Sequence, residues 1–219
     1  MDYAVIVESL PVYGEAALLT LRIGAVGIVL ALTVGLTCAI IQVFHIPVLR
    51  QVVAAYIELS RNTPLLVQLF FLYFGLPKLG VVLSAEACAY IGLAFLGGSY
   101  MSEAFRSGFE QIAPIQSQSA QALGFNRGQI MRHVLFPQAF SYAIPALTAN
   151  VIFLIKETSV FSILALPDLV YVAKEQIGND YTTSEALVVL VLFYLVILLP
   201  ISLLAALAEK KVRNVYLGQ

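Results

Sequence analysis

Residues 118–124 read Gln118-Ser119-Ala120-Gln121-Ala122-Leu123-Gly124, and residues 134–139 read Val134-Leu135-Phe136-Pro137-Gln138-Ala139. Both belong to a polar island from Arg106 to Gln138 that lies between long apolar runs. Alanine and leucine favour a short helix, which Gly124 can end by taking a positive φ, and Pro137 can open the next helix at its first turn. The island therefore predicts a helix-turn-helix pair on the water side of the chain, suited to docking a soluble protein.

The composition around this island is that of a membrane protein. Of the 219 residues, 60% are hydrophobic and 11% are charged, with a mean hydropathy of +0.91, whereas soluble domains carry about 25% charged residues. The alternating pattern of membrane-barrel strands is absent, so helices must satisfy the backbone in lipid. We expect one all-α membrane domain over residues 1–219. Five windows are long and apolar enough to span a bilayer: Ala17–Ile41, Val52–Gly75, Val81–Met101, Ala139–Ile155 and Ala186–Ala208.

The N-terminal residues 1–16 lack a basic flank before an apolar core and contain Asp2, Glu8 and Glu15. They do not resemble a cleaved secretion signal. We interpret them as a short amphipathic segment that leads into the first span.

The basic residues predict the orientation, because short cytoplasmic loops hold an excess of lysine and arginine. With five spans, the basic groups in three regions fall on one side. We therefore place the N-terminus outside and the C-terminus in the cytoplasm. The net charge of −1 gives no electrostatic reason to expect a nucleic acid partner. The residues on the predicted cytoplasmic side are Arg50, Arg106, Arg127, Arg132, Lys210, Lys211 and Arg213.

Several kinds of chemistry have no pattern in this sequence. Cys38 and Cys88 fall inside apolar spans, where a free cysteine behaves as a small hydrophobe, so neither a disulfide nor a metal site is expected. His45 and His133 are isolated on predicted cytoplasmic segments, without a nucleophile arranged beside them. No glycine-rich loop precedes Lys-Ser or Lys-Thr. We expect no enzyme activity and no cofactor in this chain, and any ATP must bind another chain.

The first polar cluster within a predicted span runs from Glu58 to Pro64 and is followed by Gln68. Pro64 should break the helix and free backbone carbonyls near Ser60. Broken helices at membrane depth are tolerated where they line a cavity or are buried in protein. One interpretation makes Glu58 and Arg61 an ion pair on the helix surface. The other gives a polar solute its donors and acceptors, from Arg61, Asn62, Thr63 and Gln68.

The second cluster is Lys156-Glu157-Thr158-Ser159, at the end of the fourth span. Adjacent residues of a helix point about 100° apart, so the two charges cannot both face lipid. Either they form an interfacial pair, or Glu157, Thr158 and Ser159 accept hydrogen bonds from a cationic group of a solute. Asp168 is a typical N-cap for a short outer helix over 169–177. Glu86, Glu103 and the tyrosines, among them Tyr56 and Tyr100, fit membrane interfaces.

Taken together, these segments resemble the permease subunits of bacterial ABC importers for polar amino acids, the histidine, arginine and glutamine type. The resemblance is nearly full length and rests on Arg61-Asn62-Thr63-Pro64-Leu65-Leu66-Val67-Gln68-Leu69, the island, and Lys156-Glu157-Thr158-Ser159. The island keeps the family's spacing between its glycine, here Gly124, and the apolar ending at Pro137. It departs from the family at three positions, with Gln118 for the usual acid, Ser119 for an alanine and Phe136 for a leucine.

The resemblance implies the fold of type I importer permeases and a coupling loop, over about 106–138, that docks on a cytoplasmic ATPase dimer carrying ATP and Mg²⁺. It also implies a second permease subunit, identical or paralogous, an extracytoplasmic amino-acid-binding protein and a location in the bacterial inner membrane. Alternating access would then import a polar or cationic L-amino acid. The implied coupling residues are Gln118, Ser119, Ala120, Gly124, Val134 and Pro137.

An ion-coupled secondary transporter or a channel subunit is the alternative, since such proteins also carry broken helices and intramembrane acids. A purely structural subunit is a third class. The sequence shows no convincing internal repeat of the kind that secondary transporters often contain. Association with an ATPase distinguishes the importer from all of these.

Overall fold

The structure of the chain, a computed structural model, describes residues 2–216, and the side chains of residues 2–212. The side chain of Arg213 lies outside the described part. The described residues form helices joined by short loops. The α-helices are α1 (Tyr3–Val43), α2 (Leu49–Arg61), α3 (Leu65–Phe70), α4 (Ala85–Glu110), α5 (Pro114–Ala122), α6 (Arg127–Ile130), α7 (Phe136–Glu157), α8 (Leu169–Asp180) and α9 (Thr183–Tyr216). Tighter or wider helical turns are η1 (Phe71–Gly75), η2 (Leu76–Leu79), η3 (Met131–Leu135) and η4 (Thr158–Leu164).

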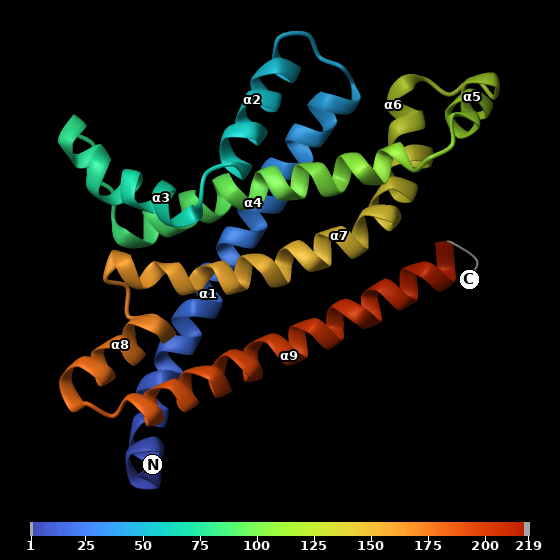
Figure 1. Ribbon diagram of the computed structural model, residues 1–219. Coiled ribbons are helices and arrows are strands. Elements are labelled where there is room, and N and C mark those ends of the chain that lie inside the picture. The colour runs from blue at the N-terminus through green and yellow to red at the C-terminus, as the bar shows by residue number, and fades with distance from the viewer. Residues whose placement is uncertain (1, 217–219) are drawn as a thin grey trace.

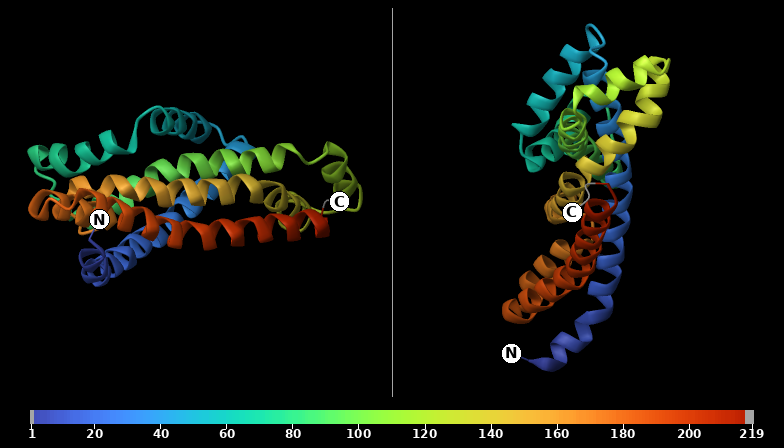
Figure 2. Two further views of the ribbon diagram at one scale, coloured as in Figure 1. Left: turned by 60° about the horizontal axis from the view of Figure 1, so that its bottom comes forward. Right: turned by 90° about the vertical axis from the view of Figure 1, so that its right-hand side faces the viewer.

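The long helices form an elongated bundle. Helix α4 packs on α7, and α7 packs on α9, while α1 crosses the bundle and packs along α4 and against α9. In Figure 2, α1 runs obliquely along one side of the other helices. Helices α5 and α6 lie at one end of the bundle, near the C-terminus, and α8 lies at the other end, near the start of α9 (Figure 1).

Three helical runs in the described part of the chain are long and apolar enough to cross a membrane: Tyr3–Val43, Arg127–Leu164 and Thr183–Val212. They contain the first, fourth and fifth expected spans. The third expected span, Val81–Met101, lies mostly in α4, which has the length to cross but contains polar residues. The second, Val52–Gly75, is two helices, because α2 ends at Arg61 and α3 begins at Leu65. The break predicted at Pro64 is confirmed.

The expected lead-in over residues 1–16 is, in its described residues, continuous with the first span. Helix α1 starts at Tyr3 and continues without interruption to Val43, although it contains Pro11. Asp2 caps it by accepting a hydrogen bond of 2.9 Å from the backbone N–H of Ala4. Tyr13 is fully buried, whereas the side chains of residues 2–12 are exposed or half-buried.

Small residues bring α1 close to α4. A Cβ atom on Gly35 would lie 2.4 Å from Cβ of Met101 and 2.8 Å from the backbone nitrogen of Ser102, and one on Gly27 would lie 2.5 Å from Leu93. Helices in membranes associate through such close backbone packing, because lipid removes the hydrophobic drive between them. The glycine face of α1 therefore determines where α4 can lie.

The polar island folds as two helices around a turn, as its sequence predicts. Gly124 follows α5 with φ of +85°, and Pro137 stands in the first turn of α7. One detail differs, because the second helical run begins earlier than Pro137. Asn126 and Gln129 form a reciprocal capping box that starts this run at Arg127.

Candidate functional site

The predicted polar clusters meet in a cavity of about 350 Å³ between the α2–α3 break, α4 and the end of α7. The break contributes polar backbone and side chains, α4 contributes an aromatic wall, and α7 contributes a carboxylate. The lining residues are Arg61, Asn62, Thr63, Pro64, Leu65, Leu66, Leu96, Tyr100, Phe153, Glu157 and Val160.

Gln68 stabilises the break that shapes this cavity. Its amide nitrogen donates hydrogen bonds to the carbonyl oxygens of Ser60, at 3.2 Å, and Thr63, at 3.0 Å. These carbonyls lack their usual helical partners because the chain breaks at Pro64. The Ser60 hydroxyl in turn donates to the Phe95 carbonyl at 2.9 Å, which ties the break to α4. Gln68 lines a different, apolar cavity between α3 and α4.

Arg61 points from the end of α2 toward α4. Its guanidinium lies 3.9 Å from a carboxylate oxygen of Glu103 and 5.1 Å from the centre of the Tyr100 ring. The same Glu103 oxygen lies 2.7 Å from Arg106, which holds it more closely. The alternative Glu58–Arg61 pair does not form, and Glu58 instead accepts a hydrogen bond of 3.1 Å from Asn62. The Arg61 guanidinium is therefore available to an anion in the cavity.

Glu157 and Lys156 point in different directions, as their adjacency on a helix requires. Glu157 is half-buried and lines the cavity, whereas Lys156 is exposed and does not. Among the described residues, Glu157 forms no ion pair. The cavity thus has a guanidinium on one wall and an unneutralised carboxylate on another.

The other members of the second cluster lie elsewhere. Thr158 is fully buried, its hydroxyl donates to the Ile155 carbonyl at 2.6 Å, and its methyl group faces Gly24 of α1. Ser159 is not among the residues that line the cavity. Of the seven predicted solute ligands, the structure brings together Arg61, Asn62, Thr63 and Glu157.

The aromatic wall is a feature that the sequence did not predict. Tyr100 and Glu103 are expected at a membrane interface, yet Tyr100 lines the cavity and Glu103 lies beside Arg61. The Tyr100 ring packs against Phe153 of α7 with centroids 5.2 Å apart. The intramembrane acid Glu103, three residues after Tyr100, was a usable signal, because such acids are by default functional.

The polar island presents an exposed surface at the opposite end of α4 from the 81–84 loop. Gln118, Ser119, Gly124 and Pro137 are exposed, and so are the apolar side chains Ile115, Leu123 and Phe125. Val134 is half-buried, and Ala120 is buried, so Ala120 packs α5 onto its neighbours and does not face outward. Exposed apolar side chains beside polar ones are typical of a protein interface.

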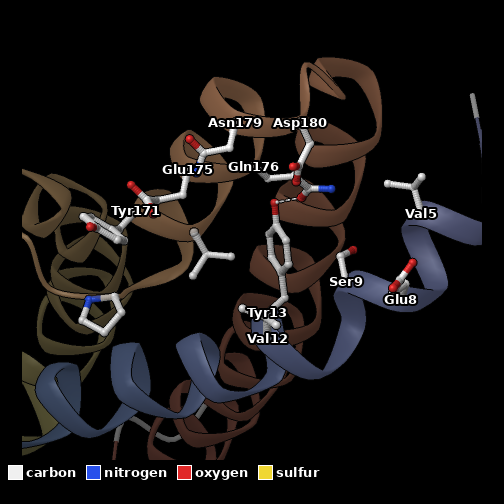
Figure 3. A pocket seen from close by; sticks show the side chains of 12 residues that line it. Val5, Glu8, Ser9, Val12, Tyr13, Tyr171, Glu175, Gln176, Asn179 and Asp180 are labelled. Atoms are coloured by element: carbon white, nitrogen blue, oxygen red, sulfur yellow. Dashed lines mark hydrogen bonds between the residues drawn. The ribbon is translucent and has the colours of Figure 1, made fainter.

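A second cavity, of about 440 Å³, lies between the N-terminal part of α1 and α8 (Figure 3). Its lining includes three acids, Glu8, Glu175 and Asp180. The Tyr13 hydroxyl joins the two helices by donating to the Gln176 side-chain oxygen at 2.9 Å. Asp168 caps α8 by accepting from the Tyr171 N–H at 2.8 Å, as predicted. This end of the molecule is acidic.

Comparisons with known proteins agree with these features. The family described as "Binding-protein-dependent transport system inner membrane component" matches residues 27–214. The probable amino-acid ABC transporter permease protein PatM of Vibrio harveyi is 32% identical over 218 residues, or 98% of each chain. The arginine transport system permease protein ArtQ of Bacillus subtilis (strain 168) is 28% identical over 98% of each chain.

A solved structure has the same fold over nearly the whole chain. The crystal structure of an amino acid ABC transporter with histidines superposes with a TM-score of 0.89 at 29% sequence identity, over 96% of this chain and 99% of that one. The predicted all-α permease fold is confirmed, and the comparisons favour the importer over the secondary transporter. The chain therefore belongs to the inner membrane components of binding-protein-dependent transport systems and is a permease subunit of an ABC transporter, with a role in transport and not in enzymatic catalysis.

Proposed function

We propose that this chain, with a second permease subunit, forms the pathway through which an ATP-driven importer moves a polar or cationic L-amino acid. The observation that carries this proposal is the cavity in which Arg61 and Glu157 offer opposite charges. Its volume of about 350 Å³ is in the range of small-molecule sites, about 300–1,000 Å³. The names of the relatives, which include amino-acid and arginine permeases, support the same substrate class.

The cavity suits a zwitterion. Arg61 can donate charge-assisted hydrogen bonds to an α-carboxylate, and Glu157 can accept them from an ammonium group. Tyr100 holds the Arg61 guanidinium over its ring, which limits the directions that the arginine can take. Asn62 and Thr63 lie on the same wall but donate to the backbone of α2, so we assign them to shaping the cavity first.

The partners follow from the family and from the exposed end of the molecule. The surface around Gln118, Ser119, Gly124, Val134 and Pro137 would dock on a cytoplasmic ATPase dimer, which would hold ATP and Mg²⁺. A binding protein would deliver the amino acid at the other end. Arg50, Arg106 and Lys210 line two cavities at the end that also carries α5, whereas the α8 end is acidic. The positive-inside rule supports a cytoplasmic C-terminus.

The substrate assignment is tested with the chain co-purified with its ATPase and binding protein in liposomes. Arg61→Gln and Glu157→Gln should each raise the KM for uptake about 10- to 100-fold, the range expected for one charged hydrogen bond. Lys156→Gln is the matched control, because Lys156 is adjacent in sequence but exposed, and it should leave the KM unchanged. Full rate and selectivity in Glu157→Gln would contradict its role.

The docking assignment has its own test. Gly124 and Gly80 have the same φ of +85° and no atom near a Cβ position, but they lie at opposite ends of α4. Gly124→Arg should abolish substrate-stimulated ATP hydrolysis while the protein remains in the membrane. Gly80→Arg imposes the same backbone strain away from the docking surface and should retain coupling. Retained ATP-driven uptake in Gly124→Arg would count against the docking surface.

A further inference from the structure

The cavity lined by Arg50 and Arg106, of about 350 Å³, lies where the loop between α1 and α2 meets the end of α4, at the basic end of the molecule. It is distinct from the cavity that contains Arg61 and from the polar island. Its lining combines hydrogen-bond donors with two apolar side chains. The lining residues are Gln42, Val43, His45, Arg50, Arg106, Phe109 and Glu110.

The charges of this cavity leave one guanidinium unneutralised. Glu110 and Arg106 pair with each other, and Arg106 also pairs with Glu103. Arg50 has no ion pair within the described part of the chain. Gln42 adds an amide donor. The His45 Nδ1 lies 2.9 Å from the Val43 carbonyl and donates there, so Nε2 of the neutral ring is an acceptor and offers no hydrogen to an anion. The cavity therefore offers several donors to an anion and carries a net positive charge.

The loop that precedes Arg50 and α2 is strained, and exposed apolar side chains surround it. His45 and Val48 have φ of +53° and +65°, values that are rare for residues other than glycine and most unusual for a β-branched one. Strained backbone of this kind clusters at binding sites and switches. Phe44, Val48, Leu49 and Val52 expose large apolar side chains around the same turn. The side chain of Val48 is 71% exposed.

We propose that this cavity binds the phosphate of an anionic phospholipid headgroup, with Arg50 as its principal ligand and the exposed apolar side chains around the loop against the acyl chains. Basic pockets between helices at the cytoplasmic side of membrane proteins are the usual place for such headgroups. A free phosphate ion would satisfy the donors equally well, but it would leave these apolar side chains in water. The adjacent acyl chains therefore favour the lipid as the source of the phosphate.

Tryptophan fluorescence tests the proposal, because the chain contains no tryptophan. The full-length Leu49→Trp variant is reconstituted in vesicles of phosphatidylcholine and phosphatidylglycerol, and quenching by brominated forms of each lipid measures their relative binding at the loop. Phosphatidylglycerol should be preferred about fivefold, the effect of one basic residue near the membrane surface. Adding Arg50→Gln should abolish this preference, and Arg50→Lys should keep most of it.

The controls distinguish lipid binding at this cavity from a general attraction of anionic lipid to the basic residues at the same end of the molecule. Arg132→Gln removes an exposed charge from the same end but away from the cavity, and it should leave the preference intact. A Val82→Trp reporter at the other end should show none. Equal quenching by both lipids at Leu49→Trp, or an equal loss with Arg132→Gln, would overturn the proposal. Loss of the preference in inorganic phosphate, but not in chloride of the same ionic strength, would identify a free-phosphate site and overturn the lipid assignment.

Discussion

At the scale of single residues, the Glu103 carboxylate lies near two arginines, Arg61 and Arg106. One of its oxygens lies 2.7 Å from Arg106 and 3.9 Å from Arg61. A substrate carboxylate at Arg61 therefore competes with a carboxylate that the protein already supplies. If the proposed site is correct, Glu103 should lower its affinity for anions and so ease release of the substrate from Arg61.

Replacing Glu103 should therefore tighten substrate binding. Glu103→Gln removes the negative charge nearest to Arg61, so we expect the KM for uptake to fall several-fold, and the effect to shrink at high salt as screening increases. Glu110→Gln is the matched control, because Glu110 pairs with Arg106 and does not contact Arg61. A KM that rises in Glu103→Gln would mean that Glu103 itself holds the substrate.

Asp168 predicts a pH dependence of stability. Burial raises the pKa of Asp168 to about 7, although its Oδ1 accepts a hydrogen bond from the Tyr171 N–H; its Oδ2 is buried without a partner. The folded protein then holds this proton more tightly than the unfolded chain, where the pKa is about 4. The free energy of unfolding should fall as the pH rises from about 4 to about 7, and this contribution should be constant above that range.

The Asp168→Asn variant tests this dependence. Asparagine keeps the cap but does not ionise, so the difference in Tm between pH 5 and pH 8, measured by thermal unfolding in detergent, should be smaller than in the parent. Asp180→Asn, an exposed acid on the same helix, should follow the parent. If the two variants show the same pH profile, Asp168 does not carry the effect.

At the scale of helices, the close contact of α1 with α4 predicts opposite effects on stability for alanine substitutions at Gly35 and Gly14 of α1. Gly35→Ala should destabilise the protein by about 1–3 kcal/mol, because its Cβ would lie 2.4 Å from that of Met101 in a packed interface. Gly14→Ala meets no atom within 4 Å and should stabilise α1 by up to about 1 kcal/mol, through helix propensity. Unfolding in detergent measures both changes, and equal effects would show that α1 and α4 do not pack as described.

The elements that could be predicted from sequence are those with local causes. Pro64 has no N–H with which to continue the hydrogen bonding of α2, Asp168 caps the residues that follow it, and Gly124 can take a positive φ, so all three appear as expected. The prediction begins the first span at Ala17, whereas α1 runs from Tyr3. Tyr13 donates hydrogen bonds to Gln176 of α8 and to the Ala186 carbonyl of α9, and such long-range contacts have no local pattern in the sequence.

At the scale of the whole molecule, the proposed orientation predicts which ends can be labelled from outside. Leu123 in the polar island and Val82 in the loop before α4 are both highly exposed, and α4 separates their ends by about 39 Å at 1.5 Å per residue. In intact cells, a membrane-impermeant maleimide should label Val82→Cys but reach Leu123→Cys only after permeabilisation. Native Cys38 and Cys88 are buried and should react little. The reverse pattern would invert the orientation.

The sequence predicts the two polar clusters of the candidate site but not their proximity in the fold. Both polar clusters can be predicted from the sequence, because charged residues within apolar runs are recognisable there without any structure. That Arg61 and Glu157 line the same cavity, and that Tyr100 and Phe153 form its wall, depends on α4 packing between the break and α7. Those contacts join residues far apart in the chain, so no local pattern encodes them. For the same reason Gln68, predicted as a ligand, instead stabilises the break.

The glycine face of α1 has a consequence for how the protein is made. Helix α1 is synthesised before α4, yet the surface that fits Gly27 and Gly35 belongs to α4. A helix forms all its backbone hydrogen bonds internally, so α1 can remain in the bilayer before α4 is made, with acyl chains covering its glycine face. The later helices then pack against α1, which is already inserted in the membrane. During biogenesis α1 must therefore be stable in the bilayer before α4 is present, and packing of α4 on α1 should displace lipid from its glycine face.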